Sequence, residues 1–371
     1  MVEQAGTPSR VVFLVWRDTD HPDGGGSEVY VEHMARWLAG RGHQVLIQCA
    51  KHPNAPADEV RDGVRFRRRG GRLTVYPRAL AYLLSSAGRR AQVVVDVHNG
   101  LPFASTLVRR RGIRVLVHHV HREQWQLIYP GMRGRVGWWL ESAFAPWIYR
   151  NRPYLTVSES SRADLIRLGI DAGRIEVVCN GIDLPHPSRL LPRSATPRLC
   201  VLGRLVPHKQ VEHALDTLAE LAPELPDLRM DVIGEGWWHE ALTKHAERLG
   251  VTGRVHFHGQ VSDAERDRLL DEAWLLLAPS VKEGWGIAIM EAAARAVPAI
   301  GYRSAGGVTE SIQDGDTGLL VADQAELTER TRFLLTDTEA RLAMGKRARE
   351  RAANFDWQSS AARFEQLILA D

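Results

Sequence analysis

The feature that most constrains the fold is a regular alternation of short apolar runs with longer amphipathic stretches along the chain. Strands that alternate with helices in this way form parallel sheets with helices on both faces. In the first half we expect strands at 11–16, 45–49, 93–97, 115–117, 155–157 and 175–179. In the second half we expect them at 199–202, 230–233, 255–257, 275–278 and 299–302. The sequence therefore predicts an α/β protein with two Rossmann-like halves.

A proline-rich segment separates the two halves. Residues 184–198 (LPHPSRLLPRSATPR) hold four prolines and no periodicity, which is typical of a linker. The net charge changes at the same place, because residues 1–190 carry 27 Lys+Arg against 17 Asp+Glu while the rest carries 21 against 28. We therefore expect an N-terminal domain over 1–190, a C-terminal domain over 191–352, and a helix over 353–371 that packs back towards the N-terminal domain.

Cysteine spacing and hydropathy exclude several classes of protein. Cys49, Cys179 and Cys200 lie far apart in the sequence, so neither a disulfide framework nor a zinc site is expected. No apolar run approaches the ~18 residues of a membrane span. The run at 11–16 is too short for a signal peptide and is followed at once by Arg17 and Asp18. A cytoplasmic protein is expected, and because no RNA-binding motif or zinc finger is present, nucleic acid is not expected as a partner.

The most informative stretch is PSVKEGWGIAIME, which runs from Pro279 to Glu291. It follows an expected strand, passes through a glycine-rich turn and enters a helix, whose first N–H groups can bind an anion. Glu283 in the turn can accept hydrogen bonds from sugar hydroxyls, and Glu291 in the helix can bond the two hydroxyls of a ribose. The candidate ligand-binding residues here are Glu283, Gly284, Trp285, Gly286, Ile287 and Glu291.

A second loop carries cations suited to a phosphate. GRLVPHK at 203–209 follows the strand expected at 199–202. Arg204 can grip a phosphate through two hydrogen bonds, and Lys209 adds a second positive charge. His208 adds a titratable group beside them. The alternative is that both cations are ordinary exposed surface residues.

A third loop, in the first half, is rich in glycine. Gly24, Gly25 and Gly26 precede a helix expected over 27–39, and Ser27 is predicted to cap it. Without side chains, Gly25 and Gly26 let the backbone approach a phosphate closely. The spacing differs from G-x-G-x-x-G, which counts against a nicotinamide site. A plain flexible turn remains the alternative.

Together these stretches resemble the retaining GT-B glycosyltransferases of family 4. The resemblance covers nearly the whole chain and rests on five segments in the family's order: PDGGGSEVYVEHMARWLAGRGHQV at 22–45, NGID at 180–183, GRLVPHK at 203–209, the E-x7-E stretch, and AGGVTESIQDGDTGLLV at 305–321. It implies the GT-B fold, with the acceptor held by the N-terminal domain and a nucleotide diphosphate sugar by the C-terminal one. It also implies that Arg204 and Lys209 replace a metal ion and that no cofactor is needed.

Three histidines follow the strand expected at 115–117, in the segment VHHVHREQW. The family resemblance implies a functional histidine at the end of this strand, close to the donor sugar. His119 aligns best with it, and His121 is the alternative. A metal site and structural polar packing are the other interpretations of the cluster. His98, after the strand at 93–97, is expected on the acceptor side.

Basic clusters and aromatic residues gather in the first half. The clusters are Arg67–Arg69 with Arg72 and Arg109–Arg111 with Arg114, and four tryptophans lie within 125–154. The arginines predict either solvated surface or attraction to anionic lipid headgroups or a phosphorylated acceptor. The aromatic residues predict either core packing or a face that contacts a membrane or an apolar acceptor. A peripheral position at the inner face of the membrane and a lipid-linked acceptor are therefore open alternatives.

The predicted reaction moves a hexosyl group from a nucleotide diphosphate sugar to an acceptor hydroxyl with retention of configuration. Because no residue stands out as a covalent nucleophile, we expect front-face attack, in which the leaving phosphate takes the acceptor proton. A sugar-nucleotide epimerase and a non-catalytic sugar-nucleotide-binding protein are the alternatives on the same fold. The base, the sugar and the acceptor are not assigned by the sequence.

Overall fold

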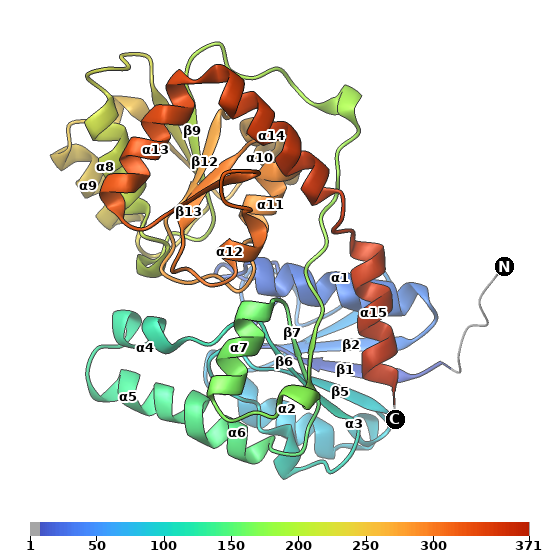
Figure 1. The fold of residues 1–371 in the computed structure, drawn as a ribbon. Coiled ribbons are helices and arrows are strands. Elements are labelled where there is room, and N and C mark those ends of the chain that lie inside the picture. Colours follow the sequence, from blue (N-terminus) through green and yellow to red (C-terminus); the bar gives the residue numbers. More distant parts are fainter. Residues whose placement is uncertain (1–7, 371) are drawn as a thin grey trace. The chain divides into compact units, whose positions relative to one another are not determined.

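The computed structural model of the protein describes residues 8–370. The chain forms two compact units, drawn in Figure 1. Unit 1 comprises the chain up to Gly181 together with the segment from Trp357 onward, and unit 2 is Ile182–Asp356. Each unit has its own largely parallel sheet covered by helices, so the predicted α/β class with two Rossmann-like halves is confirmed.

The sheet of unit 1 has the strand order β3-β4-β2-β1-β5-β6-β7-β8. Every neighbouring pair is parallel except β3 and β4. The central strands are buried on both faces, as expected when helices cover a parallel sheet. The strands are β1 (Arg10–Leu14), β2 (Gln44–Cys49), β3 (Asp58–Arg61), β4 (Val64–Arg68), β5 (Val93–Val97), β6 (Ile113–Val117), β7 (Tyr154–Thr156) and β8 (Ile175–Val177).

The β3–β4 hairpin at one edge of this sheet lies outside the predicted strands. Its two-residue turn is Asp62–Gly63, with φ of 51° and 77°. Positive φ at both positions is what a type I′ hairpin turn requires. The strands were missed because β4 (VRFRR) carries arginines where a buried strand would carry apolar residues.

Helices cover the unit 1 sheet, and one of them comes from the far end of the chain. Helix α15 packs on α1 and β1, where Phe364 stacks on Phe13 with ring centroids 6.0 Å apart. Helix α7 is capped by Ser158, whose hydroxyl accepts from the Ser161 N–H. The helices are α1 (Gly26–Gly40), α2 (Val75–Leu84), α3 (Ser86–Arg89), α4 (Arg122–Ile128), α5 (Met132–Trp139), the π turn Leu140–Phe144, α6 (Ala145–Ile148), α7 (Glu159–Arg167) and α15 (Trp357–Leu369).

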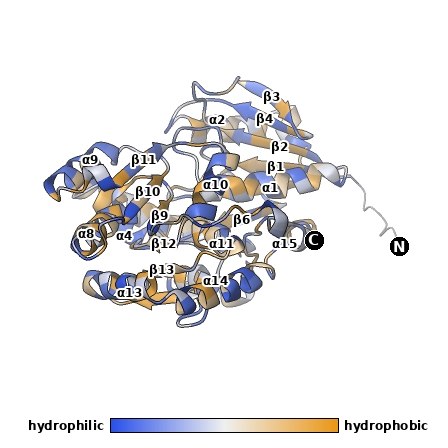
Figure 2. Cartoon of the chain, turned by 90° about the horizontal axis from the view of Figure 1, so that it is seen from above, coloured by the Kyte–Doolittle hydropathy of each residue, from blue (hydrophilic) through white to orange (hydrophobic). Residues whose placement is uncertain are grey.

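The sheet of unit 2 is parallel throughout, with the order β11-β10-β9-β12-β13-β14. Figure 2 shows hydrophobic colouring on central strands such as β12 and β13, whose side chains form the core with α8 and α13. The strands are β9 (Arg198–Leu202), β10 (Arg229–Ile233), β11 (Val255–Gly259), β12 (Leu275–Ala278), β13 (Ala299–Tyr302) and β14 (Gly318–Val321). The helices are α8 (Val211–Leu221), α9 (His239–Arg248), α10 (Asp263–Glu272), α11 (Ile287–Ala294), α12 (Val308–Ser311), α13 (Gln324–Thr336) and α14 (Thr338–Ala352).

The strand orders place one topological switch point in each sheet. In unit 1 the chain runs from β1 to β2 on one side and later returns to β5 on the other. In unit 2 the corresponding strands are β9, β10 and β12. Ligands of such sheets bind beyond the carboxyl ends of the strands at the switch point. The loops after β1 and β5 in unit 1 and after β9 and β12 in unit 2 are therefore the places to look for a site.

Candidate functional site

The loop after β9 leaves the switch point of unit 2 through a glycine with positive φ. Gly203 has φ of 148°, and a side chain on Gly234 would meet the Gly203 carbonyl oxygen at 2.1 Å, so the loops after β9 and β10 pack backbone to backbone. Leu205, next to Arg204, is buried and donates its N–H to the Glu235 carbonyl at 2.8 Å. The residues on either side of Arg204 are thus both packed against the loop that follows β10.

Lys209 and Glu283 are brought together by two neighbouring loops. The Lys209 Nζ lies 2.5 Å from the Glu283 Oε1, and the Ser280 hydroxyl donates to the same oxygen at 2.6 Å. The Val281 N–H bonds the His208 carbonyl at 2.9 Å and so ties the loop after β12 to the loop after β9. An ammonium and a carboxylate expected to bind phosphate and sugar therefore sit side by side at the switch point.

The turn that carries Glu283 is fixed by close backbone contacts. The Glu283 N–H donates to Ala305 at 2.9 Å, and its carbonyl accepts from Gly307 at 3.1 Å. A side chain at Gly307 would meet the Gly284 carbonyl oxygen at 2.3 Å. Gly286 caps α11 in a left-handed conformation, with φ of 93°. The turn from Gly284 to Ile287 therefore offers backbone groups at a helix start, where an anion is stabilised.

Two predicted residues of this region have buried side chains. Trp285 is almost fully buried and packs edge-on against Phe355, with ring centroids 5.4 Å apart. The indole therefore belongs to the core, and only its backbone is placed to meet a ligand. His208 is buried as well.

Glu291 lies in the second turn of α11 and is paired. Its Oε1 is 3.3 Å from the Arg266 guanidinium, and 24% of its side chain is exposed. Burial raises the pKa of Glu291, Arg266 opposes that shift, and the neighbouring Asp267 and Asp263 add to it. The pairing of Arg266, on α10, with Glu291 was not predicted, because the sequence of α10 carries no pattern typical of a ligand site.

The glycine-rich loop of unit 1 connects β1 to α1. Gly25 is the N-cap of α1, and its N–H donates to the Glu28 Oε2 at 2.8 Å. The prediction that Ser27 caps the helix is wrong, since Ser27 lies inside it and donates to Glu28. A side chain at Gly24 would meet the Thr19 carbonyl oxygen at 2.9 Å, so this glycine is required by the turn. Gly25 and Gly26 thus stand at the start of a 15-residue helix, a position that favours anions.

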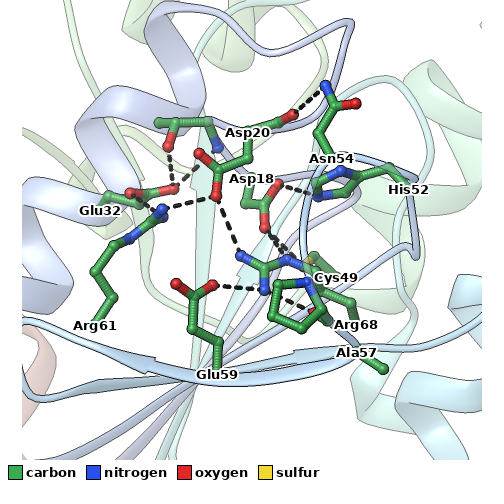
Figure 3. A network of polar contacts seen from close by, with 12 residues as sticks. Asp18, Asp20, Glu32, Cys49, His52, Asn54, Ala57, Glu59, Arg61 and Arg68 are labelled. Atoms are coloured by element: carbon green, nitrogen blue, oxygen red, sulfur yellow. Dashed lines mark hydrogen bonds and ion pairs between the residues drawn. The ribbon is translucent and has the colours of Figure 1, made fainter.

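A buried ion-pair network holds this loop against the β3–β4 hairpin (Figure 3). The Arg68 side chain is fully buried and contacts Asp18 at 2.5 Å, Glu59 at 2.8 Å and Asp20 at 3.4 Å. Arg61 contacts Asp20 at 2.7 Å. Both interpretations of the Arg67–Arg69 cluster, as solvated surface or lipid contact, are therefore wrong for Arg68. A buried guanidinium needs several carboxylate partners because removing charges from water is costly.

The carboxylate of Asp18 joins further groups to this network. Its Oδ1 lies 2.8 Å from the His52 Nε2, and the Cys49 thiol approaches Oδ2 at 3.7 Å. Asp18 and Asp20 both take part in this network. They connect the ends of β1, β2 and β4, and so fix the backbone that leads to Gly25.

The three histidines after β6 have three different surroundings. His118 is buried edge-on against Tyr30, and burial lowers its pKa to about 4. The His119 Nε2 lies within 3.3 Å of the Gln124 amide. The His121 Nδ1 lies 2.8 Å from the Glu141 carboxylate, and the rings of His119 and His121 are 4.1 Å apart at their centroids. The structure therefore brings both candidate histidines to the carboxyl end of β6 and adds Glu141, which the sequence did not indicate.

His98, at the end of β5, is buried. Its Nε2 lies 3.3 Å from the Gly100 carbonyl, and burial lowers its pKa. It lines a small cavity together with Val120, Glu141 and Tyr154. His98 therefore lies buried beneath the histidine cluster, next to Glu141.

The aromatic segment divides into core and surface residues. Tyr149 and Tyr154 are buried, and the Tyr149 hydroxyl donates to Asp96 at 2.5 Å. Trp139 and Trp147 are 57% and 60% exposed. Other exposed apolar side chains of the segment are Leu127, Met132 and Val136. Core packing therefore accounts for the two tyrosines, whereas the exposed residues lie outside the core. No helix within residues 8–370 has the length and hydropathy to cross a bilayer.

Comparisons with known proteins match both units. Residues 24–186 match the model described as "Glycosyltransferase Family 4", and residues 186–351 match "Glycosyl transferases group 1". A glycogen synthase of Mycobacterium tuberculosis is 28% identical, with 93% of this chain and 91% of the relative covered. A GDP-mannose-dependent alpha-(1-6)-phosphatidylinositol monomannoside mannosyltransferase of Mycolicibacterium smegmatis is 26% identical, with 94% and 95% covered.

Solved structures show the same fold. A sucrose-phosphate synthase from Thermosynechococcus elongatus superposes with a TM-score of 0.83 at 20% identity, covering 97% of this chain and 98% of its own. HepE of Anabaena, solved in complex with UDP and glucose, superposes with a TM-score of 0.76 at 18% identity and covers 97% and 99%. With glycosyltransferase domains matched in succession and relatives that span both units, the chain is a glycosyltransferase of the GT-B fold.

Proposed function

We propose that the protein transfers a hexosyl group from a nucleotide diphosphate sugar to an acceptor hydroxyl, with retention and without a metal ion. The observation that carries the proposal is the Lys209–Glu283 pair at the switch point of unit 2. A cation for the diphosphate and a carboxylate for the sugar stand 2.5 Å apart on two fixed loops. The donor described for the mannosyltransferase relative, GDP-mannose, supports a nucleotide sugar here as well.

Each residue has a role in this proposal. Arg204 and Lys209 stabilise the negative charge that grows on the diphosphate as the glycosidic bond breaks. Glu283 accepts hydrogen bonds from the sugar, and Glu291 from the ribose. Without a donor, Glu283 compensates the charge of Lys209, so donor binding exchanges this ion pair for a bond between Lys209 and phosphate. Because the cations carry the charge stabilisation, excess EDTA should leave the activity unchanged, and activity restored by magnesium after EDTA would contradict this role.

For the bond exchange we propose front-face attack. The acceptor oxygen forms its bond to the anomeric carbon on the face from which the phosphate oxygen leaves, and that phosphate oxygen takes the acceptor proton. The product then keeps the configuration of the donor. The anomeric configuration of the product, read by proton NMR before equilibration, tests this assignment, and an inverted product would contradict it.

For the acceptor we propose a lipid-linked molecule reached by peripheral contact with the membrane. The exposed side chains of Trp139, Trp147 and Met132 give an apolar surface, and Arg133 and Arg135 lie exposed on the same helical segment. Apolar rings enter the headgroup boundary while arginines meet anionic phosphates. Co-sedimentation with phosphatidylglycerol vesicles should occur at low salt and be lost at high salt. Absence of pelleting at low salt would contradict membrane contact and leave the transferase assignment intact.

The donor is found with a panel of UDP-glucose, GDP-mannose, ADP-glucose and dTDP-glucose. At 100-fold excess over its Kd, a true donor should stabilise the protein by about 2.7 kcal/mol in thermal unfolding. Release of nucleoside diphosphate from that donor then separates the alternatives. An epimerase would return a changed nucleotide sugar, and a non-catalytic binding protein would return the donor unchanged.

A further inference from the structure

The buried carboxylate of Glu141, next to the histidine cluster, lies in a π turn of a helix. The helical segment from Met132 to Ile148 contains a π turn at Leu140–Phe144, and Glu141 lies in that turn with 2% of its side chain exposed. A π turn changes which face the following side chains take and occurs frequently at functional sites. Here it turns Glu141 inward, whereas Trp139, two residues earlier, is exposed.

Glu141 binds two neighbouring residues through both of its oxygens. Its Oε1 accepts from the His121 backbone N–H at 3.1 Å and meets the His121 Nδ1 at 2.8 Å. Its Oε2 accepts from the Trp125 Nε1 at 2.6 Å. Burial favours the neutral acid, but His121, His98 and the Trp125 N–H together hold the pKa of Glu141 below its usual range. The ionised carboxylate can only accept, so the proton of the shared bond resides on the His121 Nδ1.

Trp125 supports the carboxylate, and its indole packs against two glycines. A side chain on Gly137 would meet ring atoms of Trp125 at 2.3 Å. One on Gly100, which has φ of 83°, would meet the ring at 3.2 Å. The indole thus lies against both glycines, and a Cβ at Gly137 would force it to shift. Its N–H fixes one oxygen of Glu141 and directs the other at His121.

The bonds to His121 determine which ring nitrogen faces outward. Both the backbone N–H and the Nδ1 of His121 are bound to one carboxylate oxygen, so the ring is held at two points. The Nε2 is the nitrogen turned away from Glu141, and 14% of the side chain is exposed. A carboxylate that holds the Nδ1–H of an imidazole sets its tautomer and its orientation.

We propose that Glu141 is a positioning residue for the transfer reaction, which holds the His121 imidazole so that its Nε2 is presented to a substrate hydroxyl beyond the carboxyl end of β6. The proposal rests on the proposed function and assigns His121, rather than His119, as the functional histidine at the end of β6. Trp125 serves as the fixed support of Glu141. Glu141 is therefore expected to affect turnover indirectly, by keeping the His121 ring in its orientation.

The Glu141→Gln variant tests this because an amide cannot serve both neighbours. If its oxygen faces His121, its NH2 meets the Trp125 N–H, and if it faces Trp125, the NH2 meets the two donors of His121. Nucleoside diphosphate release is measured with whichever donor of the four-member panel the wild type turns over. We expect kcat to fall about tenfold or more, as when other orienting carboxylates are altered, with the Kd for the nucleoside diphosphate unchanged.

Two further variants separate positioning from folding. Glu123→Gln makes the same change at an exposed residue of α4 and should keep the wild-type rate. Trp125→Phe combined with Glu141→Gln removes the clash of donors, so the amide oxygen can return to His121 and part of the lost kcat should be recovered. A Glu141→Gln enzyme as active as Glu123→Gln would overturn the proposal, as would a double variant no better than Glu141→Gln at equal thermal stability.

Nitrogen-15 NMR of histidine-labelled protein provides a readout that does not depend on activity. The His121 signals are assigned by their loss in His121→Gln. In the wild type the Nδ1 should stay protonated between pH 6 and 8, and in Glu141→Gln the ring should populate the Nε2–H tautomer. An unprotonated Nδ1 in the wild type would overturn the proposal. If no panel donor is turned over, the proposed function is what fails, and the NMR measurement still decides whether Glu141 sets the ring.

Discussion

The buried guanidinium of Arg68 allows a prediction about stability that can be worked out from its contacts. In Arg68→Met the apolar stem is kept and the charge is lost, so Asp18, whose side chain is fully buried, retains His52 but loses its guanidinium at 2.5 Å. Glu59 loses a contact of 2.8 Å, while Asp20 still has Arg61. Removing one partner of a buried ion pair costs about 3–5 kcal/mol. For a body of the size of unit 1, this lowers its Tm by roughly 6–20 °C.

Differential scanning calorimetry of the unit 1 transition measures this loss. The matched control is Arg65→Met, on the same strand but exposed, which should change the free energy of unfolding by less than about 0.5 kcal/mol. Adding Asp18→Asn to Arg68→Met removes the uncompensated charge and should recover much of the stability. If Arg68→Met behaved like Arg65→Met, or if the double variant were less stable than Arg68→Met, the account of this network would be refuted.

Three further predictions concern the donor site and the C-terminal helix. Glu291→Ala should weaken donor binding by about 1.5–3 kcal/mol through lost bonds to the ribose, and unchanged affinity in calorimetry would remove it from the site. Arg204→Ala and Lys209→Ala should each lower kcat by about 100-fold with little change in Tm, and near-native rates in both would refute the phosphate role. His43, Trp37 and Arg41 outweigh burial and lower the pKa of Glu365, so its stabilisation is present at neutral pH and is lost as the pH falls through that lowered value. Glu365→Gln should therefore flatten the acid limb of the unfolding curve, and an unchanged acid limb would show that the contact is not stabilising.

Much of the fold follows from the sequence because strands buried on both faces carry continuous apolar runs. Each predicted strand is present, with ends that differ by a few residues. The β3–β4 hairpin was missed although Asp62–Gly63 is a strong hairpin signal, because its flanks do not alternate cleanly between apolar and polar residues. The burial of Arg68 was missed as well. The sequence shows only a basic cluster, and the three carboxylates around Arg68 are seen only in the tertiary structure.

The candidate site was predictable where function depends on loops that follow strands. Lys209 and Glu283 are 74 residues apart in the sequence, yet both follow strands that are neighbours in the sheet, and the sequence assigned both to the donor site. Glu141 could not be found in this way. It reaches His121 from a helix through a π turn, and neither the turn nor its direction has a signature in the sequence. Arg266 was missed because it also comes from a helix packed behind the site.

The return of α15 to unit 1 has a consequence for how the chain is made on the ribosome. The chain leaves unit 1 after Gly181 and re-enters it at Trp357, and these residues lie against each other. While unit 2 is being translated, the surface of α1 and β1 that Phe364 covers has no partner from its own chain. At usual rates of synthesis this interval lasts roughly ten to forty seconds. During this interval unit 1 lacks α15, and its uncovered apolar surface can bind chaperones or associate wrongly. A stop codon before Trp357 would therefore destabilise unit 1, although most of that unit is translated first.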